Sequence, residues 1–370
     1  MVDLNGQYQR IKAEVDASIQ EVLNTNYYIG GPKVKSFQDN LSKYLSVKHV
    51  IPCANGTDAL QIALMALGLE PDDEVIVPAF TYVATAEVIA LLRLKPVMVE
   101  VDPDTFNLTA EIIESAITER TKAIVPVHLY GQSCDMQPIV EIAQKYNLRI
   151  VEDNAQAIGA TYTFPDGTTQ STGTIGDIGT TSFYPSKNLG AYGDGGAIFT
   201  NNDYLAEQLK MIANHGQQRR YYHDVVGCNS RLDALQAAVL DIKLKYLDDY
   251  CAARQAVAGF YDKAFVNMTK LQIPARQYNS THVFHQYTLR VLNGKRDELK
   301  AYLQEKGIPS VIYYPLALHQ QQAYSKWVTE DVKLPISEQL CSEVLSLPMH
   351  TELTEDTLSY ISNTIKKFFN

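Results

Sequence analysis

The feature that most constrains the fold of this chain is an alternation of short apolar strands with helices between residues 49 and 153. The strand-like segments are residues 50–53, 74–78, 96–100, 122–128 and 148–153. Continuous apolar strands separated by helices are typical of a mainly parallel sheet with helices on both faces. Ligands bind to such sheets beyond the carboxyl ends of the strands. The pattern therefore predicts an α/β fold, built as three layers α/β/α, with a functional site at that edge.

One carboxylate stands at this edge of the predicted sheet. Asp153 ends the strand 148–153, and the alternation of side chains places its neighbour Glu152 on the opposite face. Asp153 is either bound only by N–H groups of the following loop, or held ionised as the partner of a buried cation. Its immediate neighbours in the sequence leave both interpretations open.

A turn of small residues, Ala54-Asn-Gly-Thr-Asp58, joins the first strand to a helix. The free N–H groups and the dipole of a helix N-terminus form a site for an anion. Gly56 would allow the anion to approach closely, and Thr57 would add a hydroxyl group. Capping of the helix by Asn55 or Thr57 explains the turn equally well.

A single lysine stands out in the turn Pro185-Ser-Lys-Asn188, between strand-like segments at 179–184 and 196–201. Burial removes water from an amine and lowers its pKa, which lets the amine attack a carbonyl as a Schiff-base lysine must. The alternative is a surface turn with Lys187 in water. The local residues do not decide between the two.

The remaining segments flank this unit. Two helices, 7–25 and 34–45, form an N-terminal arm within residues 1–47. Residues 200–245 are expected to be helical, with a helix over 233–247 at their end. After it we expect helices at 250–266, 295–306 and 354–368, and strands near 282–292 and 309–314. The expected division is a large domain, 1–245, and a smaller C-terminal α+β domain, 246–370.

Charge and composition disfavour several classes of protein. The formal net charge of -10 argues against a nucleic-acid or anionic-membrane surface, because phosphate groups require basic patches. The five cysteines are scattered without a CxxC pair, and the histidines lack metal-ligand spacing, so no metal site is expected. The N-terminus does not read as a signal peptide, and no run reaches the length of a transmembrane helix. We therefore expect a cytoplasmic protein.

Six motifs, in order along the chain, together resemble the DegT/DnrJ/EryC1/StrS family of nucleotide-sugar aminotransferases, which are fold-type I pyridoxal-phosphate enzymes. They are Asn-Gly-Thr-Asp-Ala-Leu at 55–60, Pro78-Ala-Phe-Thr-Tyr82, Glu152-Asp-Asn-Ala-Gln156, Ser182-Phe-Tyr-Pro-Ser-Lys187, Gly193-Asp-Gly-Gly196 and Asn229-Ser-Arg-Leu-Asp233. The resemblance implies a large domain that binds pyridoxal 5'-phosphate and a small α+β domain after it.

The resemblance also implies roles for individual residues. Lys187 would bind the cofactor as a Schiff base and move a proton between the substrate and cofactor carbons. Asp153 would pair with the pyridinium nitrogen, which keeps the ring able to take up electrons. The other implied contacts are Gln156 near the ring hydroxyl, Tyr82 on the ring face, Gly56, Thr57 and Ser182 at the phosphate, and Asn229 reaching the phosphate from a partner subunit. A homodimer with shared active sites is therefore implied.

Three further residues, Arg231, Tyr314 and His319, match family positions near the sugar nucleotide. A loop histidine is also commonly structural, so both interpretations of His319 stay open. For His128 and His215 a structural role is expected.

The implied reaction is transamination, with pyridoxamine 5'-phosphate as the aminated form of the cofactor. Some family members are dehydratases that carry histidine at the lysine position or cysteines for an iron–sulfur cluster, whereas this chain has Lys187 and scattered cysteines. The amino group would pass from L-glutamate to a ketone of a dTDP- or UDP-linked sugar. Amino-sugar and surface-polysaccharide synthesis, such as that of lipopolysaccharide O-antigen, would use the product.

The position of the ketone follows from two motif residues. Enzymes that act at C-4 often carry Ser-Phe-His-Pro-x-Lys followed by Gly-Glu-Gly-Gly. This chain has Tyr184 and Asp194 at the corresponding positions, which is more similar to the C-3 group. We therefore expect a C-3 aminotransferase, with a C-4 enzyme as the alternative.

Two other classes of protein fit parts of the pattern. A Rossmann-type dehydrogenase shares the alternation of strands and helices, but no GxGxxG follows the first strand. A non-catalytic relative would bind a cofactor or a sugar nucleotide without needing Lys187, Asp153 and Gln156 together, because a scaffold requires no electron sink. The complete set therefore favours an enzyme.

Overall fold

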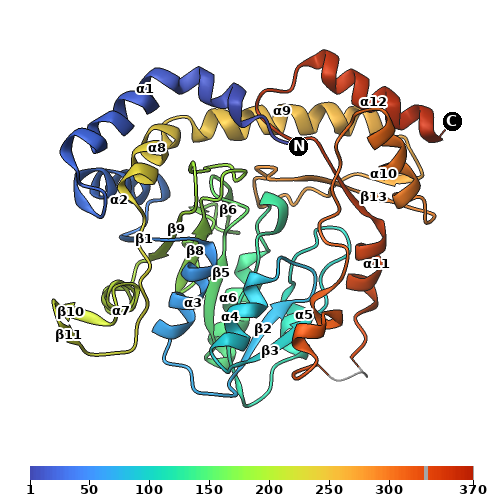
Figure 1. The fold of residues 1–370 in the computed structure, drawn as a ribbon. Coiled ribbons are helices and arrows are strands. Elements are labelled where there is room, and N and C mark those ends of the chain that lie inside the picture. Colours follow the sequence, from blue (N-terminus) through green and yellow to red (C-terminus); the bar gives the residue numbers. More distant parts are fainter. Residues whose placement is uncertain (329–331, 370) are drawn as a thin grey trace.

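A computed structural model describes residues 1–328 and 332–369 of the chain. Its centre is a seven-stranded sheet with the strand order β1-β9-β8-β5-β4-β2-β3 (Figure 1). The strands are β1 (His49–Cys53), β2 (Glu74–Pro78), β3 (Lys95–Val99), β4 (Thr121–Ile124), β5 (Arg149–Asp153), β8 (Ile178–Ser182) and β9 (Gly196–Thr200). Strand β9 runs antiparallel to β1 and β8, and the other pairs in this sheet are parallel. The predicted α/β fold with a mainly parallel sheet is confirmed.

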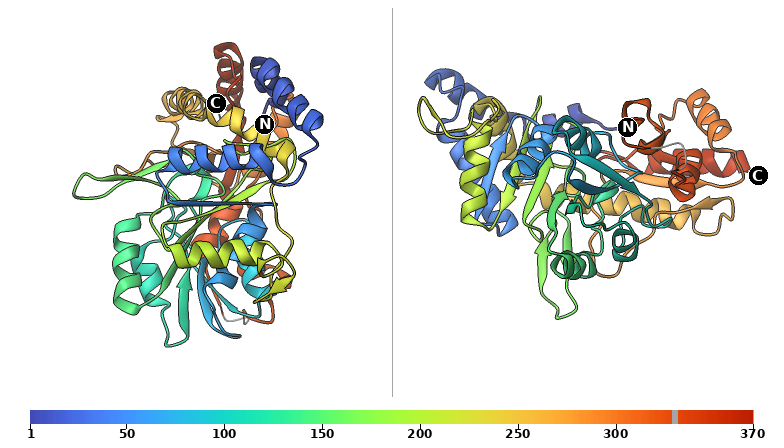
Figure 2. Two further views of the ribbon diagram at one scale, coloured as in Figure 1. Left: turned by 90° about the vertical axis from the view of Figure 1, so that its left-hand side faces the viewer. Right: turned by 90° about the horizontal axis from the view of Figure 1, so that it is seen from below.

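Helices cover both faces of the sheet, because successive side chains of a strand point to opposite sides. Val75 and Val77 of β2 pack in one helical layer, and Ile76 between them packs in the other. The first layer holds α3 (Gly56–Ala66), α4 (Ala84–Leu91) and α7 (Asp203–Ala213). The second holds α2 (Gly31–Leu45), α5 (Ala110–Ser115), α6 (Met136–Tyr146) and α8 (Ala234–Leu244). Figure 2 shows helices on both sides of the sheet, which is the predicted three-layer arrangement.

The C-terminal part of the chain has its own sheet and hydrophobic core. Helices α9 (Leu247–Phe265), α10 (Arg296–Glu305) and α12 (Glu355–Phe369) pack with the antiparallel strands β12 (Leu271–Gln272), β13 (Tyr287–Val291) and β14 (Val344–Leu347). Helix α11 (Pro335–Glu343) leads into β14. The expected boundary between residues 245 and 246 falls in the short link between α8 and α9. The division into two domains stays a prediction.

Helix α1 (Leu4–Thr25) connects the two parts of the molecule along their upper side in Figure 1. Ile11 and Val15 pack against Val239 of α8. Next to Ile11, Arg10 forms an ion pair of 2.6 Å with Glu352, just before α12. The predicted N-terminal arm is thus a packed part of the fold.

One expected strand, at residues 309–314, is not formed. Val311 makes an isolated bridge to Ser346 of β14, and the pairing stops there. Tyr313 and Tyr314 turn instead into the cavity described below. Pro315 follows them and has no N–H group to continue a ladder.

The expectation that residues 200–245 are helical was also wrong in its middle part. Between α7 and α8 the chain forms a small hairpin, β10 (Gln217–Arg219) and β11 (Tyr222–His223). Gly216 before the hairpin has a φ of +70°, a conformation that favours glycine and takes the chain out of the helical direction.

The remaining short elements are the hairpin β6 (Thr161–Thr163) and β7 (Thr169–Ser171) and the 3-10 turns η1 (Leu129–Gly131), η2 (Leu318–Gln320) and η3 (Gln322–Tyr324). Across the described ranges, none of the helices combines the length and apolar character needed to span a membrane.

Candidate active site

A cavity of about 670 Å³ lies at the carboxyl ends of the parallel strands, the edge that the strand pattern predicted. Its volume is in the range typical of cofactor and substrate sites. The residues predicted for the site that line it are Gly56, Thr57, Tyr82, Asp153, Gln156, Ser182, Lys187 and Tyr314. The fold therefore brings together residues from four separate sequence motifs and from the C-terminal part of the chain.

Lys187 lies in a turn in the wall of this cavity. Its backbone N–H donates to the carbonyl of Tyr184 at 2.8 Å, which holds the turn closed. Burial lowers the pKa of the Lys187 amine to about 8, and the negative charge of Asp153 opposes part of this shift. A solvated surface turn would not shift the pKa in this way. The structure therefore favours the interpretation of Lys187 as a reactive amine.

Asp153 and Glu152 lie next to each other in β5 but face opposite sides of the sheet, as predicted. Glu152 is fully buried and accepts hydrogen bonds from the backbone N–H groups of Gly173, Ile175 and Gly176 at 2.8, 2.6 and 2.6 Å. The ring of His128 lies 2.8 Å from the same carboxylate. These four contacts give Glu152 and His128 a structural role.

Asp153 has fewer partners and opens to the cavity. Its carboxylate accepts a hydrogen bond from the hydroxyl of Thr85 at 2.8 Å and one from the N–H of Ala155 at 3.1 Å. An ionised carboxylate can accept about four hydrogen bonds. Asp153 can therefore accept a further donor on its cavity side.

The turn before α3 satisfies both interpretations that the sequence left open. The side chain of Asn55 caps the helix by accepting a hydrogen bond from the N–H of Asp58 at 2.8 Å. Gly56 and Thr57 at the start of the helix nevertheless line the cavity. A Cβ atom on Gly56 would lie 2.7 Å from Cβ of Ser182, so only glycine lets the two turns approach so closely. Capping and anion binding are thus compatible here.

Gln156 links the floor of the cavity to its C-terminal wall. Its Oε1 accepts a hydrogen bond from the N–H of Tyr130 at 2.8 Å, and its Nε2 donates to the hydroxyl of Tyr314 at 3.1 Å. Tyr82 stands at the mouth with 56% of its surface exposed, and its ring centroid is 6.3 Å from that of Tyr314. Tyr82 is therefore available to stack on a planar ligand.

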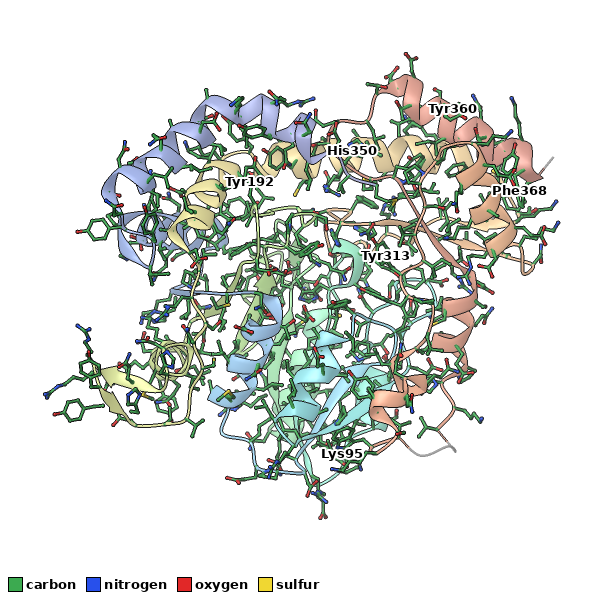
Figure 3. The ribbon with its side chains drawn as sticks, in the orientation of Figure 1. Lys95, Tyr192, Tyr313, His350, Tyr360 and Phe368 are labelled. Carbon is green, nitrogen blue, oxygen red and sulfur yellow. The ribbon has the colours of Figure 1, made fainter. Side chains whose placement is uncertain are left out.

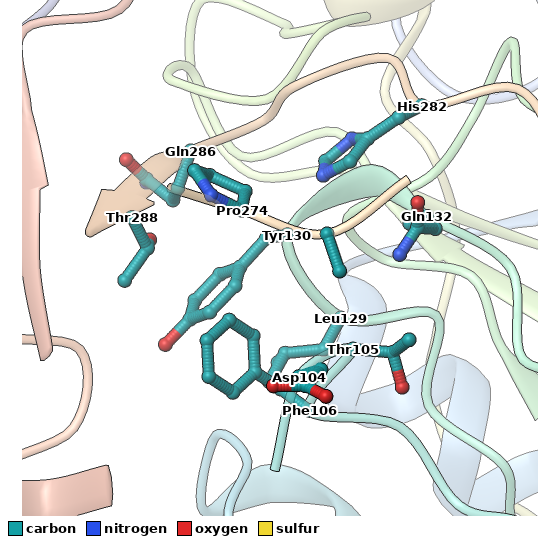
Figure 4. Close-up of a pocket in the computed structure, with 11 residues that line it drawn as sticks. Asp104, Thr105, Phe106, Leu129, Tyr130, Gln132, Pro274, His282, Gln286 and Thr288 are labelled. Atoms are coloured by element: carbon teal, nitrogen blue, oxygen red, sulfur yellow. The ribbon is translucent and has the colours of Figure 1, made fainter. Parts of the chain in front are cut away.

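A second, much smaller cavity of about 10 Å³ lies behind Tyr130 (Figure 4). It shares Tyr130 and Gln286 with the large cavity, and it has room for about one water molecule. The hydroxyl of Tyr130 donates to the backbone carbonyl of Tyr313. Tyr130 thus forms a wall between the two spaces and supports the segment that carries Tyr314.

Three predicted site residues do not line the cavity of this chain. Asn229 and Arg231 are exposed on the loop before α8. His319 is buried, and its Nε2 lies 3.0 Å from Glu338, a carboxylate of α11. This contact favours the structural interpretation of His319. The expected position of Asn229 in a partner's site is not tested by a single chain.

Sequence reasoning assigned no role to five residues that line the cavity: Tyr130, Ser186, His285, Gln286 and Tyr313. Tyr184 and Asp194 also line it, and sequence reasoning had used them only to distinguish action at C-3 from action at C-4. His285 is the least predictable of the five, because it lies far from the motifs in the sequence. Burial, with the charges of Lys187 and Arg254, keeps the pKa of His285 well below its usual range. Its ring is therefore neutral near pH 7.

An amine with a lowered pKa, a carboxylate with free capacity and a helix N-terminus converge in one cavity of a mainly parallel α/β sheet. This combination defines the class of fold-type I pyridoxal-phosphate enzymes. The chain belongs to the DegT/DnrJ/EryC1/StrS aminotransferase family, whose sequence model matches residues 9–366. It is therefore an aminotransferase.

Curated relatives and solved structures agree with this assignment. The chain is 48% identical, over 97% of both chains, to the UDP-2-acetamido-2-deoxy-3-oxo-D-glucuronate aminotransferase of Pseudomonas aeruginosa. It is 42% identical to the UDP-N-acetyl-3-dehydro-alpha-D-glucosamine 3-aminotransferase of Acidithiobacillus ferrooxidans, over 99% of this chain and 97% of the relative. The crystal structure of S. venezuelae DesV with a ketimine intermediate superimposes with a TM-score of 0.94, at 38% identity over 99% and 97% of the two chains.

Proposed function

We propose that this aminotransferase transfers an amino group from L-glutamate to the 3-oxo group of a UDP-linked 2-acetamido sugar. UDP, the 2-acetamido group and the 3-oxo group are common to the substrates named for the two relatives above. The observation that carries the proposal is the placement of Lys187 and Asp153 in one cavity with the N-terminus of α3. The amino sugar would serve surface-polysaccharide synthesis.

The residues of the cavity fit pyridoxal 5'-phosphate. Asp153 has acceptor capacity left for a pyridinium N–H group. Gly56, Thr57 and Ser182 line the cavity at the N-terminus of α3, where a phosphate group would bind. Tyr82 and Gln156 line the same cavity, where Tyr82 would cover the ring face and Gln156 would lie near the ring hydroxyl. When bound, the cofactor supplies an electron sink for the substrate's carbon atom. Nζ of Lys187 would hold the cofactor and would then carry the proton at the reacting carbon atom.

Two residues in the segment between β8 and β9, which also carries Lys187, support action at C-3. Tyr184 and Asp194, the two motif residues that distinguish this chain from the C-4 pattern, both line the cavity. Tyr184 is 56% exposed at the mouth, where a sugar nucleotide would enter. The alternative is a C-4 aminotransferase. The 3-oxo and 4-oxo sugars used in the test of the function distinguish between the two.

The active enzyme would be a homodimer with shared sites. Asn229 and Arg231 are exposed in one chain, and Tyr82 and Tyr184 leave large parts of their rings uncovered at the cavity mouth. A second copy would supply Asn229 to the phosphate and Arg231 to the negatively charged sugar nucleotide. Mixing Asn229→Ala with Lys187→Ala protein should restore part of the activity. An absence of rescue in proven mixed dimers would contradict shared sites.

We place the enzyme in the cytoplasm, in keeping with an acidic chain whose five cysteines are all free. Its cysteines show no disulfide pattern that would point to an oxidising compartment.

The test of the function begins with the absorbance of the cofactor-loaded protein before and after L-glutamate. Loss of the visible band shows that glutamate donates the amino group. The aminated protein is then offered UDP-linked 3-oxo and 4-oxo 2-acetamido sugars and a dTDP-linked 3-oxo sugar, and recovery of the band reports the acceptor. Fastest recovery with the UDP-linked 3-oxo sugar is expected. Recovery with the 4-oxo or dTDP-linked sugar alone would overturn the proposed acceptor, and no band with the cofactor would overturn the enzyme class.

A further inference from the structure

A buried lysine that the reaction does not use lies on α8, behind the turn that carries Lys187. Lys243 is 1% exposed. Its ammonium group donates to the backbone carbonyl of Gly190 at 2.7 Å and lies 4.6 Å from the ring centroid of Tyr192. Within residues 1–328 and 332–369 it forms no ion pair with a carboxylate, and burial lowers its pKa to about 8.

The carbonyl that Lys243 holds belongs to the same closed turn as Lys187. The turn is fixed at one end by the hydrogen bond from Lys187 N–H to Tyr184, and at the other by one from Ala191 N–H to Phe183, each 2.8 Å long. A Cβ atom on Gly190 would lie 2.3 Å from the carbonyl oxygen of Pro185, so the two limbs of the turn are in direct contact. We therefore expect a shift of Gly190 to move the backbone of the turn that holds Lys187.

The same face of α8 holds this segment at a second point. Gln236 lies two helical turns before Lys243 and accepts a hydrogen bond from the N–H of Tyr192 at 2.8 Å. Tyr192 also packs edge-on against Tyr8 of α1, with ring centroids 6.0 Å apart. Figure 3 shows Tyr192 beside α8 and beneath α1. The segment after Lys187 is thus fastened to two helices.

A buried ammonium group in this position destabilises the fold unless its interactions offset the loss of hydration. Removing an ammonium group from water opposes folding, and an apolar side chain of similar volume would fill the same space at a lower cost. A structural filler between α8 and the turn would therefore not need to be a lysine. The charge provides a strong hydrogen bond to one carbonyl, and that carbonyl lies three residues from the reactive amine.

We propose that Lys243 is a positioning residue, which holds the Lys187 turn in its place in the cavity wall through the carbonyl of Gly190. The proposal rests on the proposed role of Lys187 as the amine that binds the cofactor. Lys243 acts on the chemistry only through the backbone and contacts neither substrate nor cofactor.

The test compares Lys243→Met, which keeps the length of the side chain, with the wild type. Displacement of a reactive group by about 1 Å costs up to about 100-fold in rate. We expect kcat to fall about 10- to 100-fold and the KM for the sugar nucleotide to stay within about twofold. The unloaded protein should also capture added pyridoxal phosphate about tenfold more slowly. Lys245, just after the end of α8, is largely exposed and pairs with Glu14 at 3.1 Å. Lys245→Met is the matched control, and its kcat and rate of cofactor capture should match those of the wild type.

A lower melting temperature with unchanged kcat and an unchanged rate of cofactor capture would overturn the proposal, because it would make Lys243 merely structural. If Lys243→Met does not fold, Gln236→Met tests the same helix face without a buried charge. It should slow both processes about threefold, and wild-type rates in it would then overturn the proposal. If Lys187→Ala formed the visible Schiff-base band at the wild-type rate, that result would instead contradict the role of Lys187 itself.

Discussion

The turn around Lys187 and the face of α8 around Lys243 each hold a lysine whose pKa is lowered, but the two lysines have different roles. Burial lowers the pKa of both amines to about 8. Lys187 faces a cavity of about 670 Å³ and the carboxylate of Asp153. Lys243 faces a backbone carbonyl and an aromatic ring. Burial makes an amine less basic, and access to a cavity decides whether that amine can react.

A substitution of Lys187 tests the difference between the two lysines most directly. Lys187→Ala should lower kcat by at least about 10³-fold, because it removes the group that moves the proton. The protein should still fold and bind pyridoxal phosphate noncovalently, without the visible band of a Schiff base. Turnover within tenfold of the wild type, measured with glutamate and the accepted sugar nucleotide, would show that another group does the chemistry.

A smaller loss of kcat is expected for a substitution of Asp153, the carboxylate that faces Lys187 and has no counterpart beside Lys243 among the described residues. Asp153→Asn should lower kcat by about 10²- to 10³-fold, because an amide cannot stabilise the positive charge on the pyridinium nitrogen. The melting temperature should change little, since the amide oxygen can still accept from Thr85. An unchanged single-turnover rate would mean that another group keeps the ring protonated.

Glu152→Gln is the matched control for this variant, one residue away on the opposite face of β5. It should show the reverse pattern, with unfolding easier by about 3 kcal/mol because buried donors lose their charged acceptor. The fraction that remains folded should keep its kcat. A kcat loss as large as that of Asp153→Asn would contradict the assignment of separate roles to the two faces.

The smallest expected effect is on the pH dependence of the acylation rate of the two lysines. An amine reacts as a nucleophile only when neutral, so the acylation rate of Lys187 in the unloaded protein should rise through pH about 8 and level off above it. A solvated lysine would rise around its ordinary pKa of about 10.4. Lys243 has a similar pKa but no access to the cavity, and its acylation should stay slow throughout. Peptide mass spectrometry at a series of pH values measures both rates.

Much of the fold was predictable because its signals are local. Apolar runs and turn residues indicated all seven strands of the main sheet within a few residues, and Glu152 and Asp153 were assigned correctly to opposite faces. The position of Lys187 between two strands was predictable for the same reason. The parallel order places these strand ends together without any further information.

The remaining parts depend on contacts between distant residues, which a single sequence does not contain. His285 and Gln286 reach the cavity because their segment packs on the turn around Gly131, where a Cβ atom would lie 3.0 Å from the N–H groups of Phe284 and His285. Residues 309–314 have the composition of a strand but turn away into the cavity at Tyr313. In the sequence, Lys243 is indistinguishable from an exposed lysine of a helix, because its burial depends on the packing of the distant turn around Gly190.

The pairing of β1 with β9 has a consequence for the order of folding. Cys53, just before the anion-binding turn, pairs with Gly196, and a Cβ atom on Gly196 would lie 2.4 Å from the carbonyl oxygen of Asn55. The strand that supports this turn is therefore synthesised after most of the large sheet. Such long-range pairings form late, because their loop must close first. A nascent chain that ends at β8 lacks both Lys187 and the strand that supports this turn, so we expect the cofactor to bind only after β9 has been made.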